Sequence, residues 1–288
     1  MEARTHWVRL SRTALCLAIL LVGCNPPTIY RVAPPKGEPP THGWTEADPQ
    51  MAFGRPAPFV DALGHYVFSL PTKLILWNWR ACNHRISPET AAVMAECLRV
   101  NQLAKVKVRF NQYSPGGEWR RLVQNSDVAP GYRYSVGVLM WLLYTALPDR
   151  LFAGLIMTDY YNPFTNTLNI YSDLPVVVLH EGGHAKDFGQ VTLKGTYAIA
   201  RILIPFELWQ EYVASEDAIS WCLATNDREM ERSAYRLLYP AFGTYVGGSI
   251  FPIAGGLIGA IPGHIVGRIR ASKVPPQTTP PRPTPVTQ

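Results

Sequence analysis

The sequence predicts an α+β fold with a small mixed sheet, because strand-like and helix-like patterns alternate along its central part. Between residues 59 and 241 the patterns follow in the order strand, helix, strand, helix, two strands and helix. The composition agrees, since 47% of the 288 residues are hydrophobic and 17% are charged, which excludes a mainly disordered chain. The formal net charge of +6 is spread along the chain without a basic stripe. Nucleic-acid binding is therefore not expected.

The N-terminus has the pattern of a bacterial lipoprotein signal. Arginines precede a short apolar run over 14–23, which suits a signal peptide and is too short to span a bilayer as a helix. The run ends in Leu21-Val22-Gly23-Cys24, which resembles the lipobox, where the cysteine is diacylated and becomes the first mature residue. The alternative is an ordinary secretory signal with a chance cysteine. We expect residues 1–23 to be removed and Cys24 to carry palmitate-type lipid.

This resemblance implies a folded part that is lipid-anchored in the bacterial cell envelope. Asn25, rather than an aspartate, follows the cysteine, which resembles outer-membrane sorting and favours the outer membrane, facing the periplasm, over the inner membrane. The body of the chain keeps Cys82, Cys97 and Cys222. A disulfide between the first two, which would close the shorter loop, and three buried free thiols are both open.

Proline-rich segments flank the predicted folded domain. Residues 24–58 lack an apolar period and predict an extended tether between lipid and domain. The folded domain, which is expected to be the catalytic one, covers 59–241. A glycine-rich apolar segment follows it over 242–267. Residues 268–288 contain Pro-Pro pairs and predict a disordered tail.

The first half of the domain contains two strand patterns and one well-marked helix. Residues 74–79 (Leu-Ile-Leu-Trp-Asn-Trp) predict a strand, and Ser87-Pro88-Glu89 opens a helix that runs to about Leu103, with serine as the cap. Residues 106–110 alternate like a half-buried strand. The sequence Ser-Pro-Gly-Gly at 114–117 predicts a turn.

The second half leads to a helix that begins near Pro175. Residues 136–147 predict an apolar helix, which is stopped by Pro148, and two strands are expected at 155–159 and 167–171. Ser172 or Asp173 is then expected to cap a helix with Pro175 in its first turn and Gly189 just past its end.

This helix carries the motif His180-Glu181-Gly182-Gly183-His184. Residues four apart on a helix project from one face, so both imidazoles can bind one metal ion. Glu181 points beside the pair, where it can act as a base on a water whose pKa zinc has lowered. The pattern is HExxH, which indicates hydrolysis of an amide, while two histidines on an ordinary helix are the bland alternative.

Two motifs together resemble a known family. Residues 66–235 resemble the gluzincin branch of the zincin metallopeptidases, in which a glutamate on a later helix is the third zinc ligand. The segment Glu211-Tyr-Val-Ala-Ser-Glu-Asp-Ala218 is similar to the Glu-x-x-Ala-Asp-x-x-Ala signature of the CAAX prenyl protease and HtpX-type family. The resemblance implies a zincin-like fold in which the strand at 167–171 is the edge strand that pairs with substrate. It also implies zinc bound by His180, His184 and Glu211, with Glu181 as the base.

Helix geometry alone leaves two candidates for the third ligand. Glu207 and Glu211 are one turn apart and share a face, whereas Glu216 points elsewhere. The small residues Ala214 and Ala218 near the stripe of Glu211, together with the resemblance, favour Glu211.

The chain departs from the family pattern at two positions. Ser215 stands where an aspartate usually supports a ligand histidine, which puts that support in doubt. Gly182 stands where a bulkier residue is usual, and either close packing of another element or room above the metal would explain it. Other polar residues are not assigned to the site: Asp187, His65, His84, His264, Tyr235 and Tyr239.

The C-terminal segment 242–267 contains no charged residue and has a glycine at every fourth position from 255 to 267. This spacing lets helices approach closely, in membranes or elsewhere. Pro252 and Pro262 interrupt the segment, so contact with a membrane and packing on the catalytic domain are equally expected.

The sequence therefore predicts a membrane-tethered zinc metallopeptidase acting on a protein or peptide substrate. The alternative from another class is a non-catalytic lipoprotein of the zincin fold that serves as a binding or assembly module in the envelope. Retention of Glu181 beside both histidines favours the enzyme, since a structural zinc site needs no base. A third hypothesis is a protein that inserts into membranes through residues 242–267.

Overall fold

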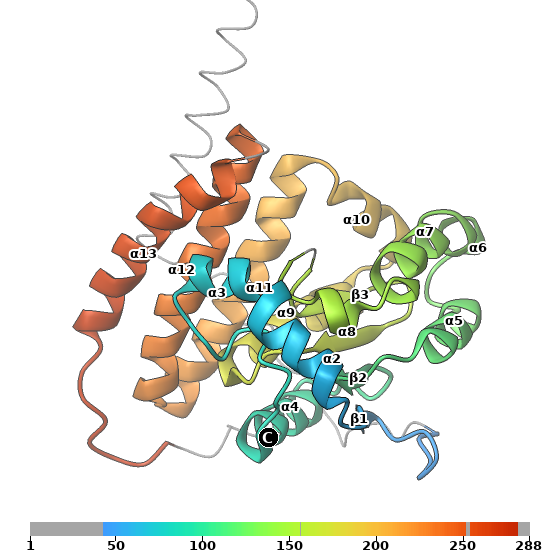
Figure 1. Cartoon of the computed structure of the whole chain (residues 1–288), viewed down its shortest axis with the longest axis horizontal. Coiled ribbons are helices and arrows are strands. Elements are labelled where there is room, and N and C mark those ends of the chain that lie inside the picture. Colours follow the sequence, from blue (N-terminus) through green and yellow to red (C-terminus); the bar gives the residue numbers. More distant parts are fainter. Residues whose placement is uncertain (1–42, 156, 252–253, 282–288) are drawn as a thin grey trace, which may run out of the picture.

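The structure of the chain, a computed structural model, describes residues 43–155, 157–251 and 254–281. Cys24 and the predicted signal peptide lie outside the described residues, as do the first part of the predicted tether and the end of the tail. The described chain has the predicted α+β arrangement with a small mixed sheet. Figure 1 shows the strands in the middle of the molecule and the C-terminal helices side by side at one end.

The sheet has four strands in the order β1-β2-β4-β3. β1 (Met51–Phe53) and β2 (Lys107–Phe110) are parallel, as are β2 and β4 (Thr167–Ile170), while β3 (Tyr160–Asn162) is antiparallel to β4. β1 is formed by residues from the predicted tether. The two sheet edges are β1 and β3.

The predicted strands at 106–110 and 167–171 are confirmed as β2 and β4, but their surroundings differ from those expected. β4 is an interior strand and not the edge strand, because the turn after β3, with Asn166 at a positive φ of 51°, folds β3 back onto it. β2 is buried along its whole length instead of half-buried. Helices on both faces of the sheet cause this burial.

One face of the sheet is covered by α4 (Pro88–Val100) and α9 (Pro175–Gln190). Their apolar side chains and those of β2 and β4 form one core cluster, which includes Met94, Leu98, Val108, Phe110, Leu168, Ile170 and Val178. On the other face, the Arg109 side chain of β2 forms a buried ion pair of 2.6 Å with Glu118 of α5 (Pro115–Gln124). This pairing satisfies two charges that burial would otherwise penalise.

Irregular helical segments extend the α5 side of the sheet. The predicted helix at 136–147 is confirmed as helical, although π-helical turns at 133–137 and 142–146 flank the short α7 (Val138–Trp141). The short α6 (Pro130–Tyr132) precedes them, and α8 (Asp149–Phe152) follows.

Three local predictions are wrong. Residues 74–79 do not form a strand: the end of α3 (Leu70–Leu76) occupies the first three, after α2 (Pro58–Leu63), and Trp77 at a positive φ of 51° ends this helix. The predicted turn at 114–117 is the start of α5, because its proline occupies the first helical turn, where a missing N–H costs nothing. The described residues of the strand expected at 155–159 form only an isolated bridge at Met157, and β3 begins at Tyr160.

The helix predicted after Ser87 is confirmed, and its cap involves a distant residue. The Ser87 hydroxyl accepts a hydrogen bond from the Thr90 amide. The hydroxyl groups of Ser87 and Thr90 each donate to the Asp173 carboxylate at 2.6 Å. Asp173 therefore supports the Ser87 cap of α4, and the prediction that Ser172 or Asp173 caps α9 is wrong. α9 begins after Leu174 without a side-chain cap and includes Gly189.

The C-terminal helices pack in sequence order. α10 (Lys194–Ala200) leads to α11 (Ile204–Thr225), which packs on α9. α12 (Arg228–Ile250) packs on α11, and α13 (Gly255–Lys273) packs along α12. Figure 1 shows this arrangement in yellow to red, with α13 outermost.

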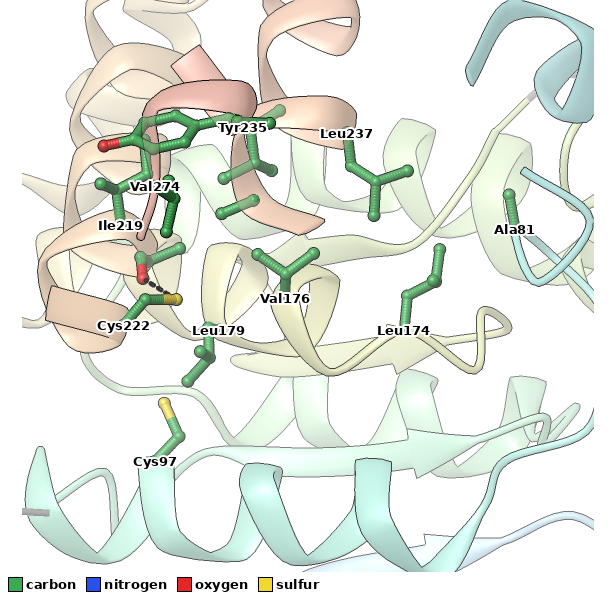
Figure 2. Packing of buried hydrophobic residues seen from close by; sticks show 14 residues of the cluster. Ala81, Cys97, Leu174, Val176, Leu179, Ile219, Cys222, Tyr235, Leu237 and Val274 are labelled. Atoms are coloured by element: carbon green, nitrogen blue, oxygen red, sulfur yellow. Dashed lines mark hydrogen bonds between the residues drawn. The ribbon is translucent and has the colours of Figure 1, made fainter. Parts of the chain in front are cut away.

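A second core lies where these helices meet α4 and α9. Figure 2 shows Leu179 of α9 between Cys97 and Cys222, with Val176 and Tyr235 nearby. Cys82, Cys97 and Cys222 are all buried free thiols, so the expectation without a disulfide is confirmed. The Cys222 thiol donates to the carbonyl oxygen of Ala218 at 3.2 Å, the dashed line in Figure 2.

The glycines of the predicted C-terminal segment bring α12 and α13 into backbone contact. A Cβ added at Gly247 would lie 1.8 Å from the carbonyl oxygen of Gly255, and one added at Gly259 would lie 2.0 Å from that of Gly243. The glycine spacing thus allows packing within the domain. In the described part of the chain, no helix combines the length and hydropathy needed to cross a membrane. Residues 268–273, expected in the tail, continue α13.

Candidate metal centre

Two helices bring the predicted ligands together. α9 places His180 and His184 one turn apart, and α11 places Glu211 opposite them. One donor atom from each of these three residues lies within 4.8 Å of the others. His184 and Glu211 are buried, and His180 is nearly so. The structure thus joins the three residues that the sequence predicts as ligands.

The spacing of the donor atoms suits a metal ion. The Glu211 Oε2 atom lies 3.3 Å from Nε2 of His180, and Oε1 lies 3.4 Å from Nε2 of His184. Neighbouring ligand atoms around a tetrahedral ion with bonds of about 2.0–2.1 Å are about 3.3–3.4 Å apart. Charge-assisted hydrogen bonds are shorter, at about 2.7–2.9 Å. Each imidazole therefore lies at such a ligand-to-ligand distance from one oxygen of the Glu211 carboxylate, and the three side chains together could hold one ion.

Glycines in the motif allow this close approach of helices. A Cβ added at Gly183 would lie 3.0 Å from Cα of Ala214, so the bare backbone of α9 lets α11 come close. A Cβ added at Gly182 would lie 2.6 Å from the Cys97 sulfur of α4. Of the two explanations left open for Gly182, the structure supports close packing. The small Ala214 has the role expected of it.

Ser215 lies beside a predicted ligand histidine, although it is not an aspartate. Its hydroxyl oxygen lies 3.3 Å from Nδ1 of His180. An Nδ1–H that donates to this oxygen would leave Nε2 free to face Glu211. The departure from the family pattern therefore keeps a polar partner at this position.

Arg201 adds a positive charge beside Glu211. It follows α10, and its guanidinium forms an ion pair with Oε1 of Glu211 and lies 3.4 Å from Oε1 of Gln210. About a third of the Arg201 side chain is exposed, at 35%, so the centre borders solvent here. The ring of Tyr245 on α12 lies 5.9 Å from the Arg201 guanidinium carbon.

Burial and charge set the protonation of these groups. Burial raises the pKa of Glu181 to about 8, so this carboxyl titrates close to neutral pH. Burial lowers the pKa of His184 to about 4, so that imidazole is neutral and can act as a ligand. Burial would raise the pKa of Glu211, but Arg201 and the two histidines outweigh it and hold that pKa well below its usual range.

Burial would also lower the pKa of His180, but the Glu211 carboxylate reverses that effect and raises it. The Glu211 carboxylate thus faces the His180 imidazole and the Arg201 guanidinium.

The other acids of α11 lie outside the centre. Glu207 is half-buried, and burial raises its pKa, with Arg201 opposing the rise. Burial likewise raises the pKa of Glu216, and the positive charge of Arg270 on α13 opposes this rise. Glu216 therefore lies on the α13 side of the helix, away from the histidines. Asp187 accepts a hydrogen bond of 2.6 Å from the Tyr197 hydroxyl and joins α9 to α10.

Histidines outside the motif have structural contacts. The buried His84 pairs with Asn111 at 2.8 Å, and His264 lies against the carbonyl oxygen of Ile75 at 2.7 Å. Tyr235 and Tyr239 pack against each other in the helical core. Arg201 and Tyr245 were not found from the sequence, because only the packing of α10 and α12 around α11 brings them to Glu211.

Comparison of the chain with protein-family models, with curated proteins and with solved structures finds no match. The interpretation of the centre therefore depends on its own geometry.

Proposed function

We propose that this chain is a zinc-dependent metallopeptidase of the gluzincin type with a zincin-like fold. The observation that carries the proposal is the placement of the Glu211 carboxylate 3.3–3.4 Å from both motif imidazoles, with Glu181 buried beside them. Two imidazoles and one carboxylate are a donor set that zinc commonly takes in catalytic sites. His180, His184 and Glu211 would hold the ion.

The chain's own residues would divide the work of hydrolysis between them. A zinc ion, when bound, would supply Lewis acidity that polarises the scissile carbonyl and acidifies water. Glu181 is the base: it takes a proton from the attacking water and delivers it to the leaving amine. Ser215 holds the orientation of His180, and Arg201 keeps Glu211 ionised.

The test separates metal binding from hydrolysis. Glu181→Gln keeps the three ligands and removes the base, so it should retain about one zinc per chain and lose hydrolysis of an unfolded protein such as casein by about a thousandfold or more. Zinc is measured by mass spectrometry of the purified protein and hydrolysis by release of peptides. If the wild-type chain binds zinc but cleaves no protein, the enzyme proposal is wrong and a non-catalytic binding module is favoured.

We also propose that lipid on Cys24 tethers the domain to the bacterial envelope. The support is the signal-like N-terminus, which lies outside the described residues. Intact-mass measurement should show a mature chain that begins at a diacylated Cys24, and Cys24→Ala should release the protein from membranes or leave it uncut. An unmodified Cys24, or cleavage at another position, would contradict the lipid anchor without bearing on the metal centre.

A further inference from the structure

The outer face of α13 exposes a continuous stripe of large aliphatic side chains. Five of them recur at intervals of one, three and four residues, so they lie on one face of the helix over about 18 Å. Each exposes at least half of its surface, from 50% to 60%. The residues of this α13 stripe are Leu257, Ile258, Ile261, Ile265 and Ile269.

The stripe lies on the opposite side of the helix from the packing face. The buried face of α13 consists of small residues such as Gly255, Gly263 and Gly267, which contact the α12 backbone directly. The helix therefore turns its smallest residues inward and its largest aliphatic residues outward, the reverse of an ordinary surface helix. Contiguous apolar surface of this kind marks an interaction site.

The borders of the stripe are aromatic and basic. The Trp77 ring, 64% exposed, stacks on His264 with centroids 4.0 Å apart, and the Arg268 guanidinium lies 4.7 Å above that ring. Arg270 and Lys273 lie in the last turn of α13. No acidic residue follows Glu231 in the sequence. An apolar face bordered by tryptophan and cations is the pattern of helices that lie at a membrane surface.

We propose that α13 lies in the plane of an anionic bilayer, with its stripe in the boundary between headgroups and acyl chains. The positive charges that border the stripe are complementary to the negative charges of anionic lipid headgroups. Because no described helix is suited to span the membrane, the contact is peripheral. It requires neither the metal centre nor lipid on Cys24, and with a lipid anchor it would hold the domain against the bilayer.

Vesicle binding by a chain without lipid tests this contact. A chain that begins at Asn25 lacks Cys24 and the signal peptide but keeps every described helix and strand. We expect it to co-sediment with vesicles of equimolar phosphatidylcholine and phosphatidylglycerol, and more weakly with phosphatidylcholine alone. Ile261→Ser with Ile265→Ser should lower the partition coefficient by about tenfold or more. Arg268→Gln with Lys273→Gln should lower it by about tenfold on the anionic vesicles only.

A matched control comes from another exposed aliphatic pair. Leu139 and Leu143 expose 53% and 47% of their surface on the α5 side of the molecule, so Leu139→Ser with Leu143→Ser should leave binding unchanged. Circular dichroism checks that each variant is folded, and Ile258→Ser with Ile269→Ser serves as a second stripe variant.

Two results would overturn the proposal. One is an absence of binding to anionic vesicles, or binding that the stripe variants leave unchanged. The other is a chain that is dimeric in sedimentation and becomes monomeric in the stripe variants without a change in vesicle binding. A second copy of the chain would then cover α13.

Discussion

The proposed third zinc ligand is a single residue of α11, Glu211. Glu211 alone among the three glutamates of this helix lies against both motif histidines, while Glu207 lies one turn before it and Glu216 faces the C-terminal helices. We expect Glu211→Gln to weaken zinc affinity by about a hundredfold or more. Loss of a residue that only hydrogen-bonds to a metal ligand already weakens metal affinity by about 10–100-fold. Glu207→Gln and Glu216→Gln should change affinity by less than about threefold. Competition with a chromogenic chelator measures all three, and a larger loss at position 207 would move the ligand back by one turn.

Ser215 offers a second test at the scale of one side chain. Its hydroxyl lies 3.3 Å from the nitrogen of His180 that faces away from Glu211. Removal of this partner by Ser215→Ala should weaken zinc affinity by about tenfold, the lower end of the usual range because the contact is long. Ser215→Asp supplies a charged acceptor at the same place and should restore affinity to at least the wild-type value. Equal affinities in all three proteins would show that Ser215 does not orient His180.

At the scale of elements, the contact between α12 and α13 offers a matched pair of neighbouring glycines. A Cβ at Gly247 would meet the Gly255 carbonyl oxygen, whereas one at Gly248 has no neighbour within 4 Å. Gly247→Ala should therefore lower the free energy of unfolding by about 2 kcal/mol, because the helices must separate. Gly248→Ala should leave it unchanged or raise it by up to about 1 kcal/mol, because alanine favours the helix. Urea denaturation measures both, and a Gly247→Ala protein as stable as the wild type would contradict the close contact.

Elements with a local signal could be predicted, and those set by distant contacts could not. α4 was predicted because Ser87 and Pro88 mark its start within a few residues of sequence. The segment that begins at Leu74 has strand-like composition, but its helix is set by the packing of α3 on α12 and α13. Asp173 was assigned to the wrong helix because its partners, Ser87 and Thr90, are far away in sequence.

The candidate site divides in the same way. The geometry of His180, Glu181 and His184 follows from spacing within one helix, so the motif alone predicts it. The position of Glu211 required a second motif on another helix. Arg201 and Tyr245 have no such motif, because they reach Glu211 only through the packing of three helices.

At the scale of the whole molecule, the helices α9, α11, α12 and α13 form successive layers on the sheet. The candidate metal centre lies between the first two layers, and the α13 stripe lies on the last. The two features therefore belong to different surfaces of one packed unit. Substitutions in the stripe are expected to leave the centre intact, so that zinc content and vesicle binding are independent readouts.

Asp149 is one of the buried carboxyl groups through which the stability of the whole fold should depend on pH. Asp149 is 6% exposed, and burial raises its pKa from 3.8 to about 7, while the Tyr160 hydroxyl donates to it at 3.1 Å. Because the folded chain holds this proton more tightly than the unfolded chain, the favourable contribution of the protonated form is complete below about pH 4. It is lost as the pH rises to about 7, by on the order of 4 kcal/mol for a shift of about three pKa units.

Asp149→Asn removes this titration while it keeps the size and polarity of the side chain. The free energy of unfolding of the wild type relative to the variant should therefore fall between pH 4 and pH 7 and stay level above about pH 8. Urea denaturation of both proteins across this range, with the metal removed by chelator, measures the difference and cancels the other titrating groups. A difference that does not change with pH would mean that Asp149 titrates near its ordinary value in the folded chain. A difference that rises with pH would mean that the folded state favours the ionised carboxylate, through the Arg150 amide that donates to it at 2.8 Å.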